Sequence, residues 1–309
     1  MEKLRKTFNP LMAAMLIGIF TLASCDNEED NNDMEPQSIV EIASSNPSFS
    51  TLVDALVKAD LVSVLEGVGP FTVFAPTNEA FEALFSDLGV SGLEDLSAEA
   101  LEPILLYHVL SGKVMSSDLT NGYVSTVSPG PEETYVSLLV ETGDVTLNGS
   151  TSVTAADIVA SNGVIHVIDK VLLPPTVVGI ALANPEFSIL VEAVVKADLV
   201  ATLNGAGPFT VFAPTNAAFQ ELFTTLEVSG IADLTKEQLV PILLYHVVSG
   251  NVVSSELSTG SVATLNGDID VSVGTDVTIN GTSKVILANV QGANGVVHAI
   301  DEVLLPSSK

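Results

Sequence analysis

The sequence predicts an α+β fold that occurs twice in tandem within 309 residues. The segment Phe-Thr-Val-Phe-Ala-Pro-Thr-Asn at residues 71–78 returns unchanged at residues 209–216, and aligning 39–78 with 177–216 gives 28 identities in 40 positions. Self-similarity at this spacing indicates a duplicated domain. In each copy, segments with helical periodicity come first and strand-like segments follow, which is typical of an α+β domain.

The first helical segment covers residues 49–65, where apolar side chains recur three and four positions apart. Asn46 followed by Pro47 fits a helix N-cap with proline at the first helical position. The segment is therefore expected to be a helix that packs one face against a core.

The next segments predict a strand followed by two more helices. Residues 71–74 are apolar and short enough for a buried strand, residues 76–78 begin a second helix, and residues 101–110 form a third. In the second copy, Thr235 and Gln238 have the spacing of a capping box at the start of the third helix.

The second half of each copy is expected to be β-structure. Three segments of the first copy have strand character: residues 134–140, 145–153 and 164–172. Asn-Gly pairs at 148–149 and 280–281 are strong signals for hairpin turns. The first copy has six extra residues, which we place in a surface loop at 128–133 because this segment is rich in Pro and Gly.

Composition excludes several classes of protein. Ten Lys and Arg stand against 38 Asp and Glu, which gives a formal net charge of −28. A chain this acidic repels phosphate backbones, so nucleic acid is not an expected partner. The single cysteine excludes an internal disulfide. The hydrophobic content of 47% is too high for a disordered chain.

Residues 1–24 have the pattern of a secretory signal peptide. Three basic residues precede an apolar run at 11–22, which is shorter than the roughly 20 residues needed to span a bilayer. The sequence Leu-Ala-Ser-Cys at 22–25 resembles a bacterial lipobox, which implies cleavage before Cys25 and acylation of that residue. Two or more acyl chains attach a protein stably to a membrane. The alternative is a secreted protein whose cysteine is incidental.

Residues 25–38 are expected to form an acidic tether. Six acids and no base lie between residues 26 and 35, and such a run is solvated and extended. Acids directly after the lipid-modified cysteine resemble the surface-export signal of lipoproteins in the Bacteroidota. Aspartate next to the cysteine also resembles the inner-membrane retention signal of enterobacteria. We expect an outer-membrane location with display at the cell surface.

Three repeated landmarks resemble the fasciclin-like domain. They are the segment at 71–78, Tyr-His-Val from residue 107, and Asn-Gly-Val-Ile-His-Val-Ile-Asp from residue 162. The resemblance covers residues 39–174 and 176–306. It implies a tandem pair of domains in a Bacteroidota-type lipoprotein, each domain a β-sandwich or wedge with several packed helices. It also implies adhesion and contact with extracellular matrix rather than catalysis.

All four histidines lie in these landmarks: His108, His166, His246 and His298. His108 lies in an apolar run, so we expect it to be buried, neutral and hydrogen-bonded to a backbone or hydroxyl group. His166 and Asp169 are three positions apart in a strand and should point to opposite faces, which argues against a metal site. No metal or other cofactor is expected.

The landmarks also predict a structural link between the ends of each domain. Thr77 and Asn78 begin a helix and have side chains suited to its free amides. We expect Asp169 to hydrogen-bond this turn and so join the last strand to the first landmark. The corresponding residues of the second copy are Thr215, Asn216 and Asp301, and His166 and His298 complete the set of structural residues.

A Tyr-His pair is the first candidate for partner contact. In animal members of the family, a Tyr-His motif that resembles this one is implicated in integrin contact. The matching residues are Tyr107, His108, Tyr245 and His246. The alternative is that these residues belong to the core.

Asp157 and Ile158 are the second candidate. They match part of an animal adhesion motif, Glu-Pro-Asp-Ile-Met, where this chain has Ala-Ala-Asp-Ile-Val at 155–159. The second copy has Asn289 and Val290 instead. The departure from the motif favours an ordinary strand-to-turn element over integrin recognition.

The sequence contains none of the zincin, nucleophile-elbow or Walker patterns. It therefore predicts a non-enzymatic cell-surface adhesion lipoprotein that contacts matrix, polysaccharide or other cells, with an unknown extracellular protein or glycan as its partner. The runner-up is an unrecognised hydrolase or small-ligand carrier on the same fold. Duplication of a binding domain raises avidity, which favours adhesion.

Overall fold

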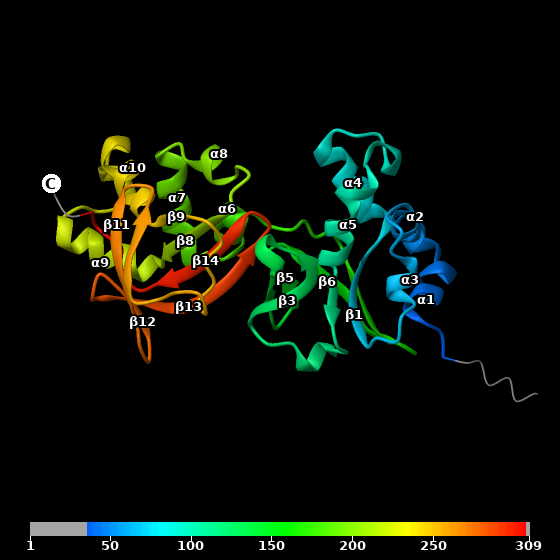
Figure 1. Cartoon of the computed structure of the whole chain (residues 1–309). Helices are drawn as coiled ribbons and strands as arrows, with labels where there is room; N and C mark the ends of the chain where they lie inside the picture. The colour runs from blue at the N-terminus through cyan, green and yellow to red at the C-terminus, as the bar shows by residue number, and fades with distance from the viewer. Residues whose placement is uncertain (1–35, 307–309) are drawn as a thin grey trace, which may run out of the picture. The chain divides into compact units, whose positions relative to one another are not determined.

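The computed structural model describes residues 36–306, and these residues contain the same architecture twice (Figure 1). We call residues 39–174 domain 1 and residues 176–306 domain 2. The signal peptide at 1–24, Cys25 and most of the tether at 25–38 lie outside the described residues. Within the described part, no single helix is long and apolar enough to span a membrane. One bent pair, Val177–Ala183 with Pro185–Lys196, passes that test by length and composition only.

Each domain contains five α-helices. In domain 1 they are α1 (Ile39–Ser45), α2 (Ser50–Lys58), α3 (Val62–Leu65), α4 (Asn78–Leu88) and α5 (Ala98–Tyr107). In domain 2 they are α6 (Val177–Ala183), α7 (Ser188–Lys196), α8 (Val200–Leu203), α9 (Asn216–Leu226) and α10 (Lys236–Tyr245).

Each domain also contains a sheet of seven strands. The strands of domain 1 are β1 (Phe71–Pro76), β2 (Val109–Ser111), β3 (Gly122–Pro129), β4 (Tyr135–Glu141), β5 (Thr146–Leu147), β6 (Thr151–Ala160) and β7 (Gly163–Ile168). Those of domain 2 are β8 (Phe209–Pro214), β9 (Val247–Ser249), β10 (Gly260–Thr264), β11 (Gly267–Val273), β12 (Val277–Ile279), β13 (Ser283–Gly292) and β14 (Gly295–Ile300). The strand order is β2-β1-β7-β6-β5-β4-β3 in domain 1, and β9-β8-β14-β13-β12-β11-β10 in domain 2.

The first and last strands of domain 1 are neighbours, second and third in the order of its sheet. β1 and β7 pair in parallel, with Phe71 opposite Gly163 and Pro76 opposite Ile168, whereas the other neighbours in this sheet are antiparallel. A Cβ atom on Gly163 would lie 2.1 Å from the carbonyl oxygen of Phe71, so this close approach requires glycine. The first and third landmarks therefore meet as one pair of strands.

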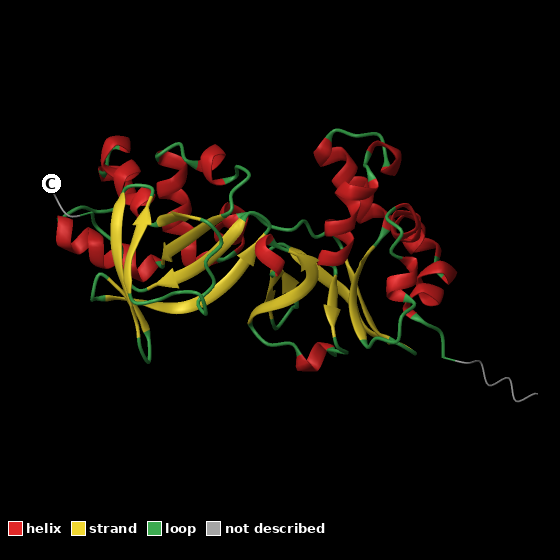
Figure 2. Ribbon diagram, in the orientation of Figure 1, coloured by secondary structure: helices red, strands yellow, loops and turns green. Residues whose placement is uncertain are grey.

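Two apolar cores lie on opposite faces of the sheet. Along β1, Val73 and Ala75 join the core under the helices, whereas Phe74 joins a second core with Leu138 and Leu147 from β4 and β5. This alternation follows from the two-residue period of a strand. Figure 2 shows the main helices of each domain gathered on one side of its strands. The prediction of an α+β fold with two tandem domains is confirmed.

The first predicted helix is divided in the structure. Pro47–Phe49 form a 3₁₀ turn capped by the side chain of Asn46, and α2 and α3 follow as separate helices. Asp60, between them, has φ of +57°, which no α-helix accommodates. The N-cap prediction is confirmed, but the continuous helix over 49–65 is wrong.

Other predicted elements are confirmed in kind and differ at their ends. The third helix ends at Tyr107 because residues 109–111 pair with β1 as β2. The capping box of Thr235 and Gln238 is present at α10. The Asn-Gly turn at 148–149 connects β5 to β6. Helix α1 was not predicted, and it begins with its own capping box of Ser38 and Glu41.

Asn162, in the third landmark, holds α1 in place. Its side-chain oxygen accepts a hydrogen bond from the Ile39 N–H at 3.0 Å, and its amide nitrogen donates to the carbonyls of Leu65 at 2.7 Å and Gly67 at 3.1 Å. Asn294 makes the same three contacts in domain 2, with Val177, Leu203 and Gly205. One side chain thus ties the β6–β7 turn to two helices.

Candidate functional site

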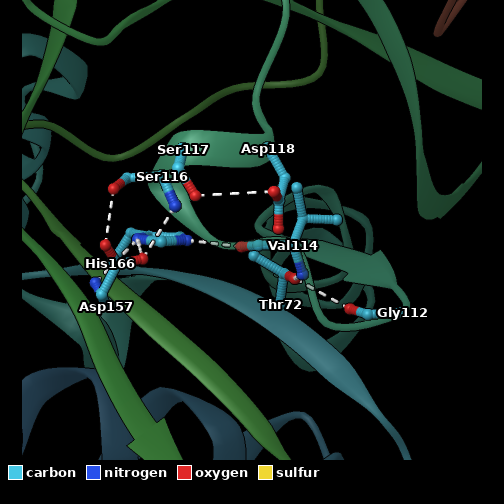
Figure 3. Close-up of polar contacts among 8 residues, drawn as sticks. All are labelled: Thr72, Gly112, Val114, Ser116, Ser117, Asp118, Asp157 and His166. Carbon is cyan, nitrogen blue, oxygen red and sulfur yellow. Dashed lines mark hydrogen bonds and ion pairs between the residues drawn. The ribbon is translucent and has the colours of Figure 1, made fainter.

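The candidate site of domain 1 surrounds the histidine of β7 (Figure 3). His166 is fully buried on β7, and Asp157 lies opposite it on β6 at an irregularity in the strand register. Asp157 has φ of +63° there, a left-handed conformation that Asp tolerates better than most residues. Ser116 reaches the same point from the short 3₁₀ helix Ser116–Asp118 that follows β2.

Hydrogen bonds join Ser116 to Asp157, and Asp157 to His166. Ser116 donates its N–H to Asp157 Oδ1 at 2.7 Å and its hydroxyl to Oδ2 at 2.5 Å. The Asp157 N–H lies 3.2 Å from His166 Nδ1, which accepts from it. His166 Nε2 lies 2.9 Å from the carbonyl oxygen of Val114, so a proton on Nε2 donates to this carbonyl while Nδ1 accepts.

The geometry argues against a catalytic Ser-His-Asp arrangement. In such a triad the serine hydroxyl donates to the histidine and the acid orients the imidazole ring. Here the Ser116 hydroxyl donates to Asp157 instead, and main-chain groups engage both ring nitrogens of His166. The cluster therefore acts as a brace between β6, β7 and the segment after β2.

Asp157 is the charged group that this brace presents to solvent. Its side chain is 35% exposed, whereas that of His166 is buried. The hydrogen bonds from Ser116, first from the hydroxyl and then from the N–H, hold the pKa of Asp157 below its ordinary value. Asp157 is therefore a carboxylate at neutral pH.

Domain 2 keeps the brace but replaces the carboxylate with an amide. Asn289 Oδ1 accepts from the Ser254 N–H at 2.7 Å, and its Nδ2 donates to the Ser254 hydroxyl at 2.8 Å. The Asn289 N–H again donates to the histidine, His298, at 3.2 Å. Burial lowers the pKa of His298, against the opposing effect of its hydrogen bond to Val252.

Thr72 supports the brace from β1, as Figure 3 shows. Its hydroxyl donates to the carbonyl of Gly112 at 2.8 Å and accepts from the Val114 N–H at 2.8 Å. This pair of bonds fixes the segment whose Val114 carbonyl receives His166. The sequence analysis missed Thr72 and Ser116, although Thr72 lies in the unchanged repeat at 71–78.

The Tyr-His pairs lie inside the domains. Tyr107 is fully buried, donates its hydroxyl to the Ser137 carbonyl at 2.9 Å and accepts from Asn148 Nδ2 at 3.0 Å. His108 contacts the Ile104 carbonyl through Nδ1 at 2.7 Å and accepts from the Leu172 N–H at 2.9 Å. Burial lowers the pKa of His108 to about 4, which confirms the prediction of a buried, neutral histidine.

The same burial corrects the expectation of partner contact for these residues. Tyr245 and His246 are also buried, and burial lowers the pKa of His246 to about 4. Because the side chains of both pairs are enclosed by their own domains, they do not form a contact surface. Of the second candidate pair, Ile158 is partly buried and packs against the core under the helices, and the Asp157 side chain is 35% exposed.

The predicted link from Asp169 to the 77–78 turn is wrong. The Asp169 carboxylate accepts from the Ser152 N–H on β6 at 2.8 Å, because Asp169 directly follows β7, the neighbour of β6. The Asp301 carboxylate likewise accepts from the main-chain N–H of Lys284 in domain 2. These aspartates hold the ends of two adjacent antiparallel strands together.

Asn78 supplies a different link. Its side-chain oxygen accepts from the Thr51 N–H at 3.0 Å, and its Nδ2 donates to the Pro47 carbonyl at 2.9 Å. Asn216 repeats both contacts in domain 2. Thr215 caps its own helix through the Ala218 N–H, whereas Thr77 makes no such cap. Across residues 36–306, no group of three or more His, Cys, Asp or Glu residues is placed to hold a metal ion.

Several known proteins and one protein family are similar to this chain. A model of the Fasciclin domain matches residues 47–174 and 185–306. Protein sll1483 of Synechocystis is 48% identical over 44% of this chain and 73% of its own length. Human periostin is 32% identical over 79% of this chain, which spans 29% of periostin. Transforming growth factor-beta-induced protein ig-h3 of Sus scrofa is 32% identical over 79% of this chain, which spans 36% of that protein.

A similar solved structure is a FAS1 domain pair from the insect cell adhesion molecule Fasciclin I. It has 20% sequence identity and a TM-score of 0.49, and it covers 85% of this chain and 98% of the solved chain. The two family matches together cover most of the present sequence. The chain therefore belongs to the fasciclin domain family and carries that domain twice.

Proposed function

We propose that this protein is a non-enzymatic adhesion lipoprotein of the cell envelope. It is anchored in the outer membrane through Cys25, displayed at the cell surface, and contacts extracellular matrix, polysaccharide or other cells through its tandem domains. The observation that carries the proposal is the duplicated fasciclin domain, because this family is linked to cell adhesion proteins. Two copies on one chain raise avidity for a repetitive surface.

The buried polar groups are hydrogen-bonded within the domains, which supports binding rather than catalysis. In the described part of the chain, no buried side-chain nitrogen or oxygen is left without a hydrogen-bond partner. The Ser116, Asp157 and His166 cluster follows this rule, since its bonds brace strands and leave no activated nucleophile. A partner would therefore be recognised by residues on the exposed surface.

The charge of each domain restricts the partner. Residues 39–174 carry 18 Asp and Glu against 3 Lys, and residues 176–306 carry 13 against 3. Such surfaces repel polyanions at close range, and salt screens this repulsion. The proposed partner is therefore a neutral or basic protein or glycan, or an anionic one that divalent cations bridge.

A pull-down tests the binding role. Residues 36–309 are immobilised and exposed to cell-envelope, matrix and glycan fractions, with and without EDTA, beside an acidic protein of similar size that lacks fasciclin domains. We expect saturable retention of a fraction by the fasciclin chain alone, competed by the same chain in solution. Loss of retention in EDTA would identify cation bridging. Turnover of a small substrate without any retained partner would overturn the adhesion role in favour of a hydrolase.

The anchor is tested separately in intact cells. The native chain should incorporate a labelled fatty acid and should be removed by protease added outside the cell. Cys25→Ala should incorporate no label. Label on the Cys25→Ala variant would contradict anchoring at this residue, and protection from external protease would contradict surface display.

A further inference from the structure

The helical core of domain 2 contains a cavity that is almost filled in domain 1. The cavity of domain 2 has a volume of about 110 Å³, and the corresponding space in domain 1 has about 20 Å³. Both lie between the first two helices, the first strand and the last helix of their domain. The domain 2 cavity is lined by residues that include Val177, Val194, Leu203, Val211, Leu243 and Val247.

Two substitutions on the helices reduce the side-chain volume around this space in domain 2. The positions of Ile39 and Leu56 in domain 1 are occupied by Val177 and Val194 in domain 2, and each change removes one carbon atom. A third difference lies on the last strand, where Ile165 of domain 1 corresponds to Val297 of domain 2. The side-chain volume is therefore smaller on α6, α7 and the last strand of domain 2, whereas the first strand, β1 or β8, has the same sequence in both domains.

The wall of the cavity offers no free polar group. His246 is the one polar side chain in the described lining, and both of its nitrogens are engaged. Nδ1 lies 2.8 Å from the Ile242 carbonyl, and Nε2 accepts from the Leu304 N–H at 2.9 Å. A buried water needs two to four polar partners, so this space suits an apolar occupant.

The cavity also has an apolar mouth. Leu182 and Val195 line it and are 65% and 60% exposed, so they connect it to the surface. Leu182 replaces Ser44 of domain 1, and the adjacent Ala183 replaces Ser45. Compared with α1, helix α6 therefore has a smaller side chain inside the domain and apolar side chains in place of two hydroxyl groups at its outer end. Both differences make the region more accessible to an apolar ligand.

We propose that the helical core of domain 2 is a binding site for a small uncharged hydrocarbon group. Its size suits a benzene-like ring or the last few carbons of an alkyl chain, because a dry apolar cavity of about 150 Å³ in another protein holds benzene. In domain 1 the larger side chains of Ile39, Leu56 and Ile165 line a space of only about 20 Å³. The site is additional to the adhesion role and does not depend on it.

Methyl NMR on residues 36–309 tests the site. Benzene should cause saturable shifts of the Val177, Val194 and Leu243 methyl signals and leave their domain 1 counterparts unchanged. The variant Val177→Ile with Val194→Leu carries the residues of domain 1 and should bind at least tenfold more weakly. The reverse variant, Ile39→Val with Leu56→Val, should gain saturable shifts in domain 1.

A second probe separates free hydrocarbons from chain ends. Dihexanoylphosphatidylcholine, used below its micelle concentration, presents a short alkyl chain on a polar head. Shifts with benzene alone assign the site to free hydrocarbons, and shifts with the lipid assign it to the end of a tethered chain. Absence of saturable shifts with both probes, or equal shifts in the filled variant, would overturn the proposal.

Discussion

The residue that faces the buried histidine of the last strand is an aspartate in domain 1 and an asparagine in domain 2. Despite this change, the contacts around the two histidines agree closely. The N–H of Asp157 and that of Asn289 each lie 3.2 Å from Nδ1, and the Nε2 contacts measure 2.9 and 3.0 Å. Away from this brace, the space under the helices differs, at about 20 Å³ against about 110 Å³.

This comparison separates what the fold requires from what it leaves open. The hydrogen bonds that hold main-chain segments together recur in both copies, including those of Asn162 and Asn294. The differences lie outside these main-chain contacts. They are the second side-chain atom of residue 157 or 289, which contacts a serine hydroxyl, and the side-chain volume on α1 and α2 compared with α6 and α7. Divergence between the two domains is therefore to be sought at these positions.

The largest expected effect tests the shared hydrogen bonds. Asn162→Ala removes three bonds to main-chain groups and leaves those groups without partners. We expect a loss of about 4 kcal/mol from the unfolding free energy of domain 1, at roughly 1 kcal/mol or more for each bond. Asn294→Ala should cost domain 2 a similar amount. Urea denaturation followed through amide NMR signals of each domain measures both, and a large inequality would break the equivalence of the two copies.

The next effect is a pH dependence common to both domains. Burial lowers the pKa of His108 and His246 to about 4 from an ordinary 6.5, so the unfolded chain binds more protons between these values. Each histidine's contribution is therefore complete above pH 6.5 and is lost as the pH falls toward 4. The loss is roughly 3 kcal/mol per domain. Urea denaturation at a series of pH values measures it, and a flat profile for either domain would contradict the buried neutral state of its histidine.

A smaller effect comes from exchanging core volume. Val177→Ile with Val194→Leu should raise the unfolding free energy of domain 2 by about 1–2 kcal/mol, because each change fills part of an existing cavity. Ile39→Val with Leu56→Val should lower that of domain 1 by about 2 kcal/mol. Urea denaturation of the two variants measures both changes in unfolding free energy. Destabilisation of domain 2 by the larger side chains would show that its cavity is not available to them.

The smallest effect comes from exchanging the carboxylate and the amide. Asp157→Asn should retain the brace, since Asn289 forms it in domain 2, and should remove a contribution present above the ordinary Asp pKa and lost in acid. Asn289→Asp should raise the pKa of His298 by placing a negative charge beside Nδ1. An NMR titration of His298 measures this shift, and an unchanged pKa would mean that the two braces differ in more than charge.

Much of the fold follows from local patterns in the sequence. The duplication, the helical first half, the Asn46 cap and the Asn-Gly turns depend on residues close together in the chain, and the structure contains them. Helix ends were less predictable, since the end of α5 at Tyr107 depends on β2 pairing with a distant strand.

The candidate site was predicted in part. The burial of His108 follows from its apolar surroundings, but the partner of Asp169 depends on strand register, which local sequence does not specify. The brace was missed because Ser116 is 41 residues from Asp157 in sequence, and because Asp157 meets His166 at an irregularity in β6. The cavity requires the packing of four elements and becomes visible only when the two copies are compared in three dimensions.

The parallel pairing of β1 with β7 has a consequence for how the chain is completed during synthesis. Phe71 pairs with Gly163, so the pairing of β1 with β7 closes a loop of about ninety residues in domain 1. Closing such long loops slows folding relative to local hairpins. As the chain leaves the ribosome, β2 becomes available to β1 early, but β7, the parallel neighbour of β1, emerges only after β2 to β6. Each domain is thus finished by its last strand, and domain 1 becomes complete before the corresponding strand of domain 2 has been made.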